Sequence, residues 1–249
     1  MRIRTLFAGA CTSILLTVPS LQAQVTWEPT RFTISGAPIF AQPRGEFGRN
    51  IGNEFGGTGA VQYHIDRAGF LSLRFDVSGV PYGSEERHVP ISQTISQRVL
   101  LDLNTTNWLT ALSLGPELAL PNGPIRPYLN AGRSKLLFRT SSALEGESNE
   151  TFVSTTNYKD STMAWFFGGG VRIPLAGRDA RKAISLDLGL RYYRGGAASY
   201  LREGSIYDNP DGSITLNPLT SPTPHVVYLI GVRYRIPHDP TAHCPRLIC

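Results

Sequence analysis

Apolar and polar residues alternate along several segments of this chain, and this period of two is typical of β-strands with one apolar face. From Val226 to Ile236 every even-numbered position is apolar, whereas the odd-numbered positions include Gly and two Arg. Segments 184–192 and 71–77 alternate in the same way. No stretch after the N-terminal segment approaches the 18 or so consecutive apolar residues of a membrane-spanning helix. The pattern therefore predicts an all-β fold.

Weaker alternation brings the number of predicted strands to eight, each of about 10 to 13 residues, which is long enough to cross a bilayer when tilted. In chain order they cover residues 31–40, 57–66, 70–78, 108–120, 128–140, 162–173, 184–192 and 226–236. The fifth strand is irregular, because Leu129 and Ala131 share a face with Arg133 and Lys135. We expect a β-bulge or a change of face near Gly132.

The links between these strands are alternately short and long. The short links are 67–69, 121–126 and 176–183, and the long ones are 41–56, 81–105, 141–161 and 195–224. Alternating links of this kind predict an eight-stranded antiparallel up-and-down barrel with both termini on the side of the short turns. In a transmembrane barrel the short turns are periplasmic and the long loops are extracellular.

Composition separates a membrane barrel from a water-soluble, lipocalin-like barrel, which has the same strand number but apolar residues inside. Only three of the 24 basic residues are Lys, and the polar strand faces are rich in Gly, Ala, Ser and Arg. A soluble barrel normally covers its outer face with Lys and Glu. Aromatic residues near strand ends are also expected to form interfacial girdles: Trp108, Tyr128, Trp165, Tyr192, Tyr228 and Tyr234. The composition favours the transmembrane barrel.

The N-terminus has the features of a secretory signal peptide, namely Arg2 and Arg4, an apolar stretch and a cleavage region ending at Ala23. The expected organisation is a signal peptide (1–23), a periplasmic lead (24–30), the barrel (31–237) and a periplasmic tail (238–249). Removal of the two arginines would lower the formal net charge of +5, so the charge does not indicate nucleic-acid binding.

Over about residues 31–237 the chain resembles the small outer-membrane β-barrels of the OmpA-like and OmpX-like group. The segment from Gly231 to Ile236 resembles their C-terminal assembly signal, although this chain continues to Cys249. The resemblance implies an outer-membrane location in a Gram-negative type of bacterium, outer-membrane lipid as surroundings and contact with the barrel-insertion machinery. It also implies a structural or surface-interaction role, such as adhesion or envelope integrity, with an extracellular ligand held by the loops. We expect a monomer.

The interior of an eight-stranded barrel is just wide enough to be filled by side chains. The residues expected to face it and form a polar network are Arg74, Asp76, Glu117, Arg172, Asp187, Arg191, Arg233 and Arg235. Charges of both signs favour a plugged lumen over the alternative, a narrow channel, because buried charges must pair. Counting along the strands places Asp187 between Arg172 and Arg233, and Glu117 beside Arg74.

An enzyme that modifies lipid A is the other alternative, and it would need a nucleophile beside a base. The histidines are His64, His88, His225, His238 and His243, and none stands in a His-x-Ser pair like that of the lipid A deacylases. We therefore expect no catalytic residues, no cofactor and no metal. Cys244 and Cys249 are close enough for a disulfide, with free thiols or a Zn or Cu site involving the tail histidines as alternatives.

Overall fold

The computed structural model describes residues 31–90, 100–145, 151–176, 184–209, 211 and 213–236. The predicted signal peptide, the lead 24–30 and the tail 238–249 with both of its cysteines lie outside these residues. None of the described helices is long and apolar enough to cross a membrane.

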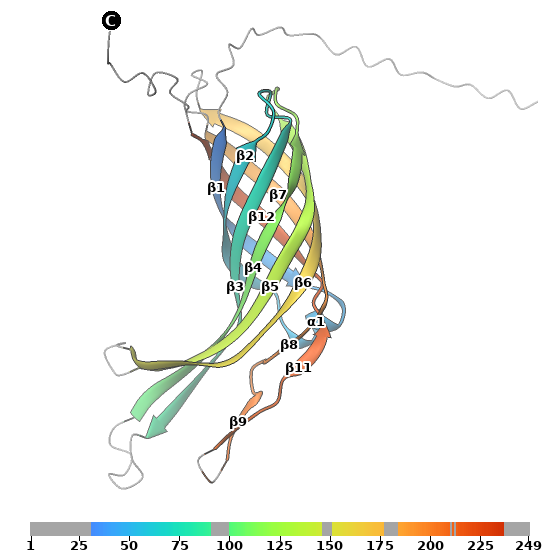
Figure 1. The fold of residues 1–249 in the computed structure, drawn as a ribbon. Coiled ribbons are helices and arrows are strands. Elements are labelled where there is room, and N and C mark those ends of the chain that lie inside the picture. Colours follow the sequence, from blue (N-terminus) through green and yellow to red (C-terminus); the bar gives the residue numbers. More distant parts are fainter. Residues whose placement is uncertain are drawn as a thin grey trace, which may run out of the picture.

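Eight antiparallel strands close into a barrel in the order β1-β12-β7-β6-β5-β4-β3-β2, as the sequence predicts (Figure 1). Their bounds are Phe32–Pro43 (β1), Glu54–His64 (β2), Leu71–Pro90 (β3), Leu100–Ala119 (β4), Arg126–Glu145 (β5), Thr151–Ala176 (β6), Ile184–Gly195 (β7) and His225–Arg235 (β12). A short helix, α1 (Gly45–Asn50), lies between β1 and β2. The segment between β7 and β12 contains β8 (Ala197–Tyr200), β9 (Ile206–Asp208), β10 (Ile214–Leu216) and β11 (Leu219–Pro222).

The two ends of the barrel differ, and we call them the turn end and the loop end. The strands nearest the two termini and the short turns share the turn end (Figure 1). In the β2–β3 turn the Asp66 carboxylate accepts hydrogen bonds from the backbone N–H groups of Phe70 (3.0 Å) and Leu71 (2.7 Å). Gly69 adopts a φ of +77°, a conformation that favours glycine, so this turn is defined by its local sequence.

Strands β3 to β6 are much longer than predicted and continue beyond the barrel wall at the loop end (Figure 1). The segments 81–105 and 141–161 were expected to be loops, but their described residues are strand. Beyond Gly79 strand β3 no longer pairs with β2, and beyond Ala164 strand β6 no longer pairs with β7. The four strands therefore form a projecting sheet, whose outer strands β3 and β6 pair there with no further described barrel strand. Its sequence contains many Ser, Thr and Asn residues without an apolar period, because both of its faces lie outside the barrel.

The prediction of a β-bulge or a change of face near Gly132 is wrong. β5 keeps one register with β4 from Trp108 opposite Arg139 to Ala119 opposite Tyr128. Arg133 and Lys135 point outward, whereas Leu136 and Phe138 are buried inside the barrel. The inward residues of β5 change from polar to apolar along the strand because the lumen is apolar toward the loop end. The same face of β5 points inward throughout.

The exterior of the barrel is apolar on all eight strands. Exposed residues include Phe32 and Ile34 (β1), Val61 (β2), Phe75 (β3), Leu118 (β4), Leu129 (β5), Phe167 (β6), Leu190 (β7) and Ile230 (β12). The expected girdle residues Trp108, Trp165, Tyr192 and Tyr228 are also exposed. The prediction that Tyr128 belongs to the girdle is wrong, because Tyr128 is buried in the lumen on the face opposite to Leu129.

Candidate functional site

A network of charged side chains fills the turn-end half of the lumen, with Glu117 at its centre. The Glu117 side chain is fully buried and accepts hydrogen bonds from Arg172 (2.5 Å), Gln62 (2.5 Å) and Arg74 (3.3 Å). These partners come from β6, β2 and β3. One carboxylate therefore links three strands besides its own, β4.

Other ion pairs cross the full width of the barrel. β3 and β7 lie four strands apart in the closed order, so they face each other. From β3, Arg74 approaches Asp187 (3.7 Å), and from β7, Arg191 approaches Asp76 (3.3 Å). Arg74 also contacts Asp76 on its own strand at 2.8 Å.

The expected position of Asp187 between Arg172 and Arg233 is only half right. Arg172 lies 3.6 Å from the Asp187 carboxylate, but the second arginine is Arg74 from the opposite wall. Arg233 pairs in register with Ser185, closer to the turn end, and its guanidinium lies 3.3 Å from His64 Nε2. Counting along neighbouring strands could not reveal a contact made across the lumen.

The remaining expected network residues take two kinds of position. Glu117 lies beside Arg74, as the counting along strands predicts. Arg235, in contrast, is half-exposed at the turn end and joins no ion pair among the described residues. His64, which hydrogen-bonds Thr33 Oγ1 at 2.9 Å, is a network member that was not predicted.

Aromatic rings and glycines fix the arginines in this network. The Arg172 guanidinium lies 4.0 Å from the centre of the Tyr128 ring, and the Arg191 guanidinium lies 4.8 Å from that of Phe166. The Tyr128 hydroxyl lies against Gly170 and Gly189, where a Cβ atom would collide with it. These glycines thin the wall and so make room for an inward aromatic ring.

An apolar cluster fills the loop-end half of the lumen. α1 packs Phe47 edge-on against Phe138 and Tyr200, with ring centroids 6.0 and 5.3 Å apart. His225 stacks on Tyr193 at 4.6 Å, and its Nδ1 lies 3.1 Å from the Thr223 carbonyl oxygen. The His225 ring is thus buried inside the barrel among aromatic rings and does not face the lipid side.

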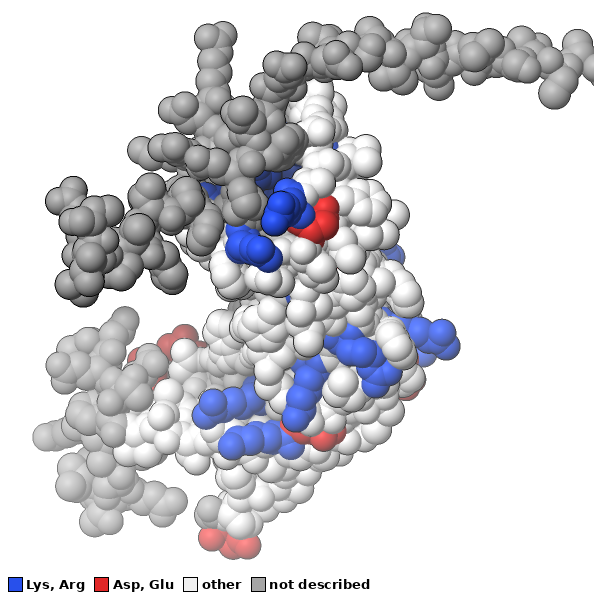
Figure 2. Space-filling model, turned by 45° about the horizontal axis from the view of Figure 1, so that its top comes forward, with Lys and Arg blue, Asp and Glu red and all other residues white. Residues whose placement is uncertain are grey.

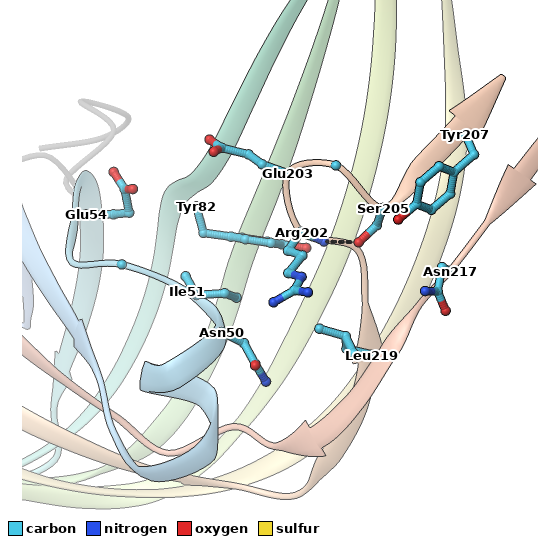
Figure 3. A pocket seen from close by; sticks show the side chains of 12 residues that line it. Asn50, Ile51, Glu54, Tyr82, Arg202, Glu203, Ser205, Tyr207, Asn217 and Leu219 are labelled. Carbon is cyan, nitrogen blue, oxygen red and sulfur yellow. Dashed lines mark hydrogen bonds between the residues drawn. The ribbon is translucent and has the colours of Figure 1, made fainter.

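A polar pocket of about 450 Å³ opens above this cluster at the loop end (Figure 3). It is lined by Asn50, Ile51, Gly52, Glu54, Tyr82, Arg202, Glu203, Gly204, Ser205, Tyr207, Asn217 and Leu219. Asn50 and Ile51 lie on one side, and Tyr207, Asn217 and Leu219 lie on the other (Figure 3). The sequence did not predict it, because the lining residues up to Tyr82 and those from Arg202 onward are separated by 120 or more positions in the chain.

The rim of this pocket is held by hydrogen bonds between the projecting sheet and the segment after β8. Gly204 N–H donates to Glu85 (3.1 Å), and Ser84 N–H donates to Glu203 (3.1 Å). Burial alone would raise the pKa of the Glu85 carboxyl, but the Gly204 N–H and Arg87 hold it below its usual value. The pKa of Glu54 is raised by burial and by the neighbouring Glu203. The pocket thus combines acidic, basic, amide and phenol groups, and no cluster suited to a metal ion occurs among the described residues.

No protein-family model and no curated protein matches the chain. Similar solved structures include a major outer membrane protein from Thermus thermophilus, at 13% identity and a TM-score of 0.48, covering 83% of this chain and 98% of that one. Neisserial surface protein A is 15% identical over 82% of this chain and 97% of its own, with a TM-score of 0.45. Ail, the attachment invasion locus protein of Yersinia pestis, is 11% identical over 84% and 100%, with a TM-score of 0.41. Similarities of this degree carry no inference about function.

The contacts in the network predict that Glu117 is the carboxylate whose replacement destabilises the barrel most. Glu117→Gln would remove the carboxylate that Arg172 contacts most closely and leave this buried arginine only its longer contact with Asp187 (3.6 Å). Breaking a buried ion pair in this way typically costs about 3 to 5 kcal/mol. Asp187→Asn should cost less, because the contacts of Asp187 are longer. The measurement is the urea midpoint of the refolded barrel.

The matched control is Glu86→Gln, which changes the same groups at an exposed position on β3 and should shift the unfolding free energy by no more than about 0.5 kcal/mol. Equal midpoints for Glu117→Gln and Glu86→Gln would show that Glu117 does not hold the network together.

Proposed function

We propose that this protein is an integral outer-membrane β-barrel with a filled lumen, and that it acts at the cell surface through its loop end. The supporting observation is the inverted polarity of the turn-end half of the barrel. Buried charges such as Glu117 and Arg172 line the inside, while apolar side chains surround the outside on every strand. A lipocalin-like barrel in water would have the opposite arrangement. Lipid is the surrounding that satisfies such an exterior.

The filled lumen favours a structural or surface-interaction role over a channel. Ion pairs that cross the lumen, such as Arg74 with Asp187, lie in series with the aromatic cluster around Phe47. An ion would have to displace both layers to pass. The protein should therefore be closed to ions in its folded state.

The loop end supports the surface role. It carries the projecting sheet and the polar pocket around Arg202, and it is the extracellular end if the turns face the periplasm. Carboxylates, amides and the ring of Tyr207 in one cavity are suited to a hydroxyl-rich ligand such as a surface glycan. Binding to a glycan array by the folded barrel, lost in Arg202→Ala and retained in the exposed control Arg49→Ala, tests this role.

The closed lumen predicts that the folded barrel does not conduct. After refolding, the protein should migrate differently on gels with and without heating, which shows that the barrel has formed. The same preparation should give no steady single-channel current in planar bilayers. Regular conductance steps from the heat-modifiable species would support the channel instead.

The apolar exterior predicts that Leu188, in the middle of β7, faces lipid between Val171 and Ile230. Leu188→Arg should destabilise the barrel in bilayers by about 2 to 4 kcal/mol, because a charge at mid-membrane depth is poorly solvated.

The control is Ser161→Arg, an exposed position on β6 on the loop-end side of Met163, where the same substitution should cost at most about 1 kcal/mol. Unfolding in lipid vesicles measures both variants. If Leu188→Arg is as stable as the parent, the outward face of β7 does not contact lipid.

A further inference from the structure

Basic side chains gather on one side of the barrel exterior. The group consists of Arg133, Lys135, Arg139, Lys159 and Arg194, all exposed, and we call it the basic patch. It lies on the adjacent strands β5, β6 and β7 and contains two of the protein's three lysines. In Figure 2, a largely uncharged zone separates the charged side chains near the terminal segments from a larger group of basic side chains.

The residues of the basic patch are neighbours through strand pairing. Trp165 on β6 stands between Arg133 on β5 and Arg194 on β7, in register with both. The Arg133 guanidinium lies 4.3 Å from the centre of the Trp165 ring. Farther toward the loop end, Arg139 and Lys159 are directly paired.

The patch begins where the apolar band ends. A strand tilted by about 40° rises roughly 2.5 Å per residue, so a band about 25 Å tall takes about ten residues. Arg194 lies ten positions after Ile184, the first residue of β7. Lys135 lies ten positions after Ile125, which precedes β5. This is the level of the lipid head groups on the loop side.

Nothing described in the protein neutralises the basic patch. None of its five side chains forms an ion pair with another described residue. The nearby Asp160 is engaged with the backbone N–H groups of Ser199 (2.6 Å) and Ser161 (2.7 Å). Like charges on adjacent paired positions repel each other, so the arrangement favours an external anion.

We propose that the basic patch binds the phosphate groups of a phosphorylated glycolipid in the outer leaflet, that is, the lipid A part of lipopolysaccharide. Cations above and apolar residues such as Phe167 and Leu190 below match the profile of this amphiphile, with phosphates at the surface and acyl chains beneath. Arg133 and Arg194 offer planar guanidinium groups for bidentate phosphate binding. The inference rests on the outer-membrane placement proposed above.

The test uses the full-length barrel refolded in detergent micelles, titrated with bisphosphorylated lipid A and monitored by native mass spectrometry. The variant Arg133→Gln/Lys135→Gln/Arg194→Gln should bind the lipid about 100-fold more weakly than the parent, because it loses three cations that contact phosphates at the head-group level. Dephosphorylated lipid A should bind the parent and the variant equally weakly.

The matched control, Arg44→Gln/Arg49→Gln/Arg67→Gln, removes the same charge from exposed positions outside the patch and should bind like the parent. Unchanged binding by the patch variant, equal affinity of the parent for both lipids, or full displacement by millimolar inorganic phosphate would overturn the proposal. Heat modifiability and insertion into vesicles are measured on the same preparations. Failure of the parent to insert would count against the outer-membrane placement, whereas insertion without lipid discrimination would count against the lipid site alone.

Discussion

The interior of an eight-stranded barrel is so narrow that each inward polar or charged side chain must form its hydrogen bonds and ion pairs with other inward side chains. Glu117 shows what this constraint requires, since its one carboxylate takes hydrogen bonds from arginines on two other strands and from Gln62 on a third. The contacts of Arg74 with Asp187 and of Arg191 with Asp76 then join opposite walls. The barrel is therefore held together by bonds across the lumen as well as by those around its wall.

The same constraint explains the layering along the axis. Each charged layer needs several strands to contribute ions at one height, and the described inward ions end near Arg191. Toward the loop end the walls carry apolar side chains such as Leu109, Leu136 and Phe138. α1 packs Phe47 against this surface, its Asn50 donates a hydrogen bond to the Tyr200 hydroxyl (3.1 Å), and its charged residues Glu46 and Arg49 stay exposed.

The sequence predicted the strands and their faces well, because a period of two decides which side chains face outward whatever the register. It did not predict contacts across the lumen, such as Arg74 with Asp187, since these depend on heights and closure. The projecting sheet was missed because polar residues such as Asn104 and Thr105 occupy both of its faces, so the sequence shows no apolar period there. Leu136 and Phe138 on the inward face of β5 indicated an apolar lumen, but this pattern was interpreted as a change of face near Gly132.

The choice between arginine and lysine follows from where each cation finds its counterion. Where the described part of the chain buries one of these two residue types in the lumen, it is always arginine, whose flat guanidinium makes several directed hydrogen bonds and stacks on rings, as Arg172 does on Tyr128. Lys135 and Lys159 face outward, where a flexible stem lies along apolar surface and carries its charge to the head-group level. Inside, the anion must be a carboxylate of the protein at a fixed height. Outside, the anion can belong to the lipid, so no protein carboxylate is needed beside the basic patch. The chain contains few lysines because little of the barrel surface faces water.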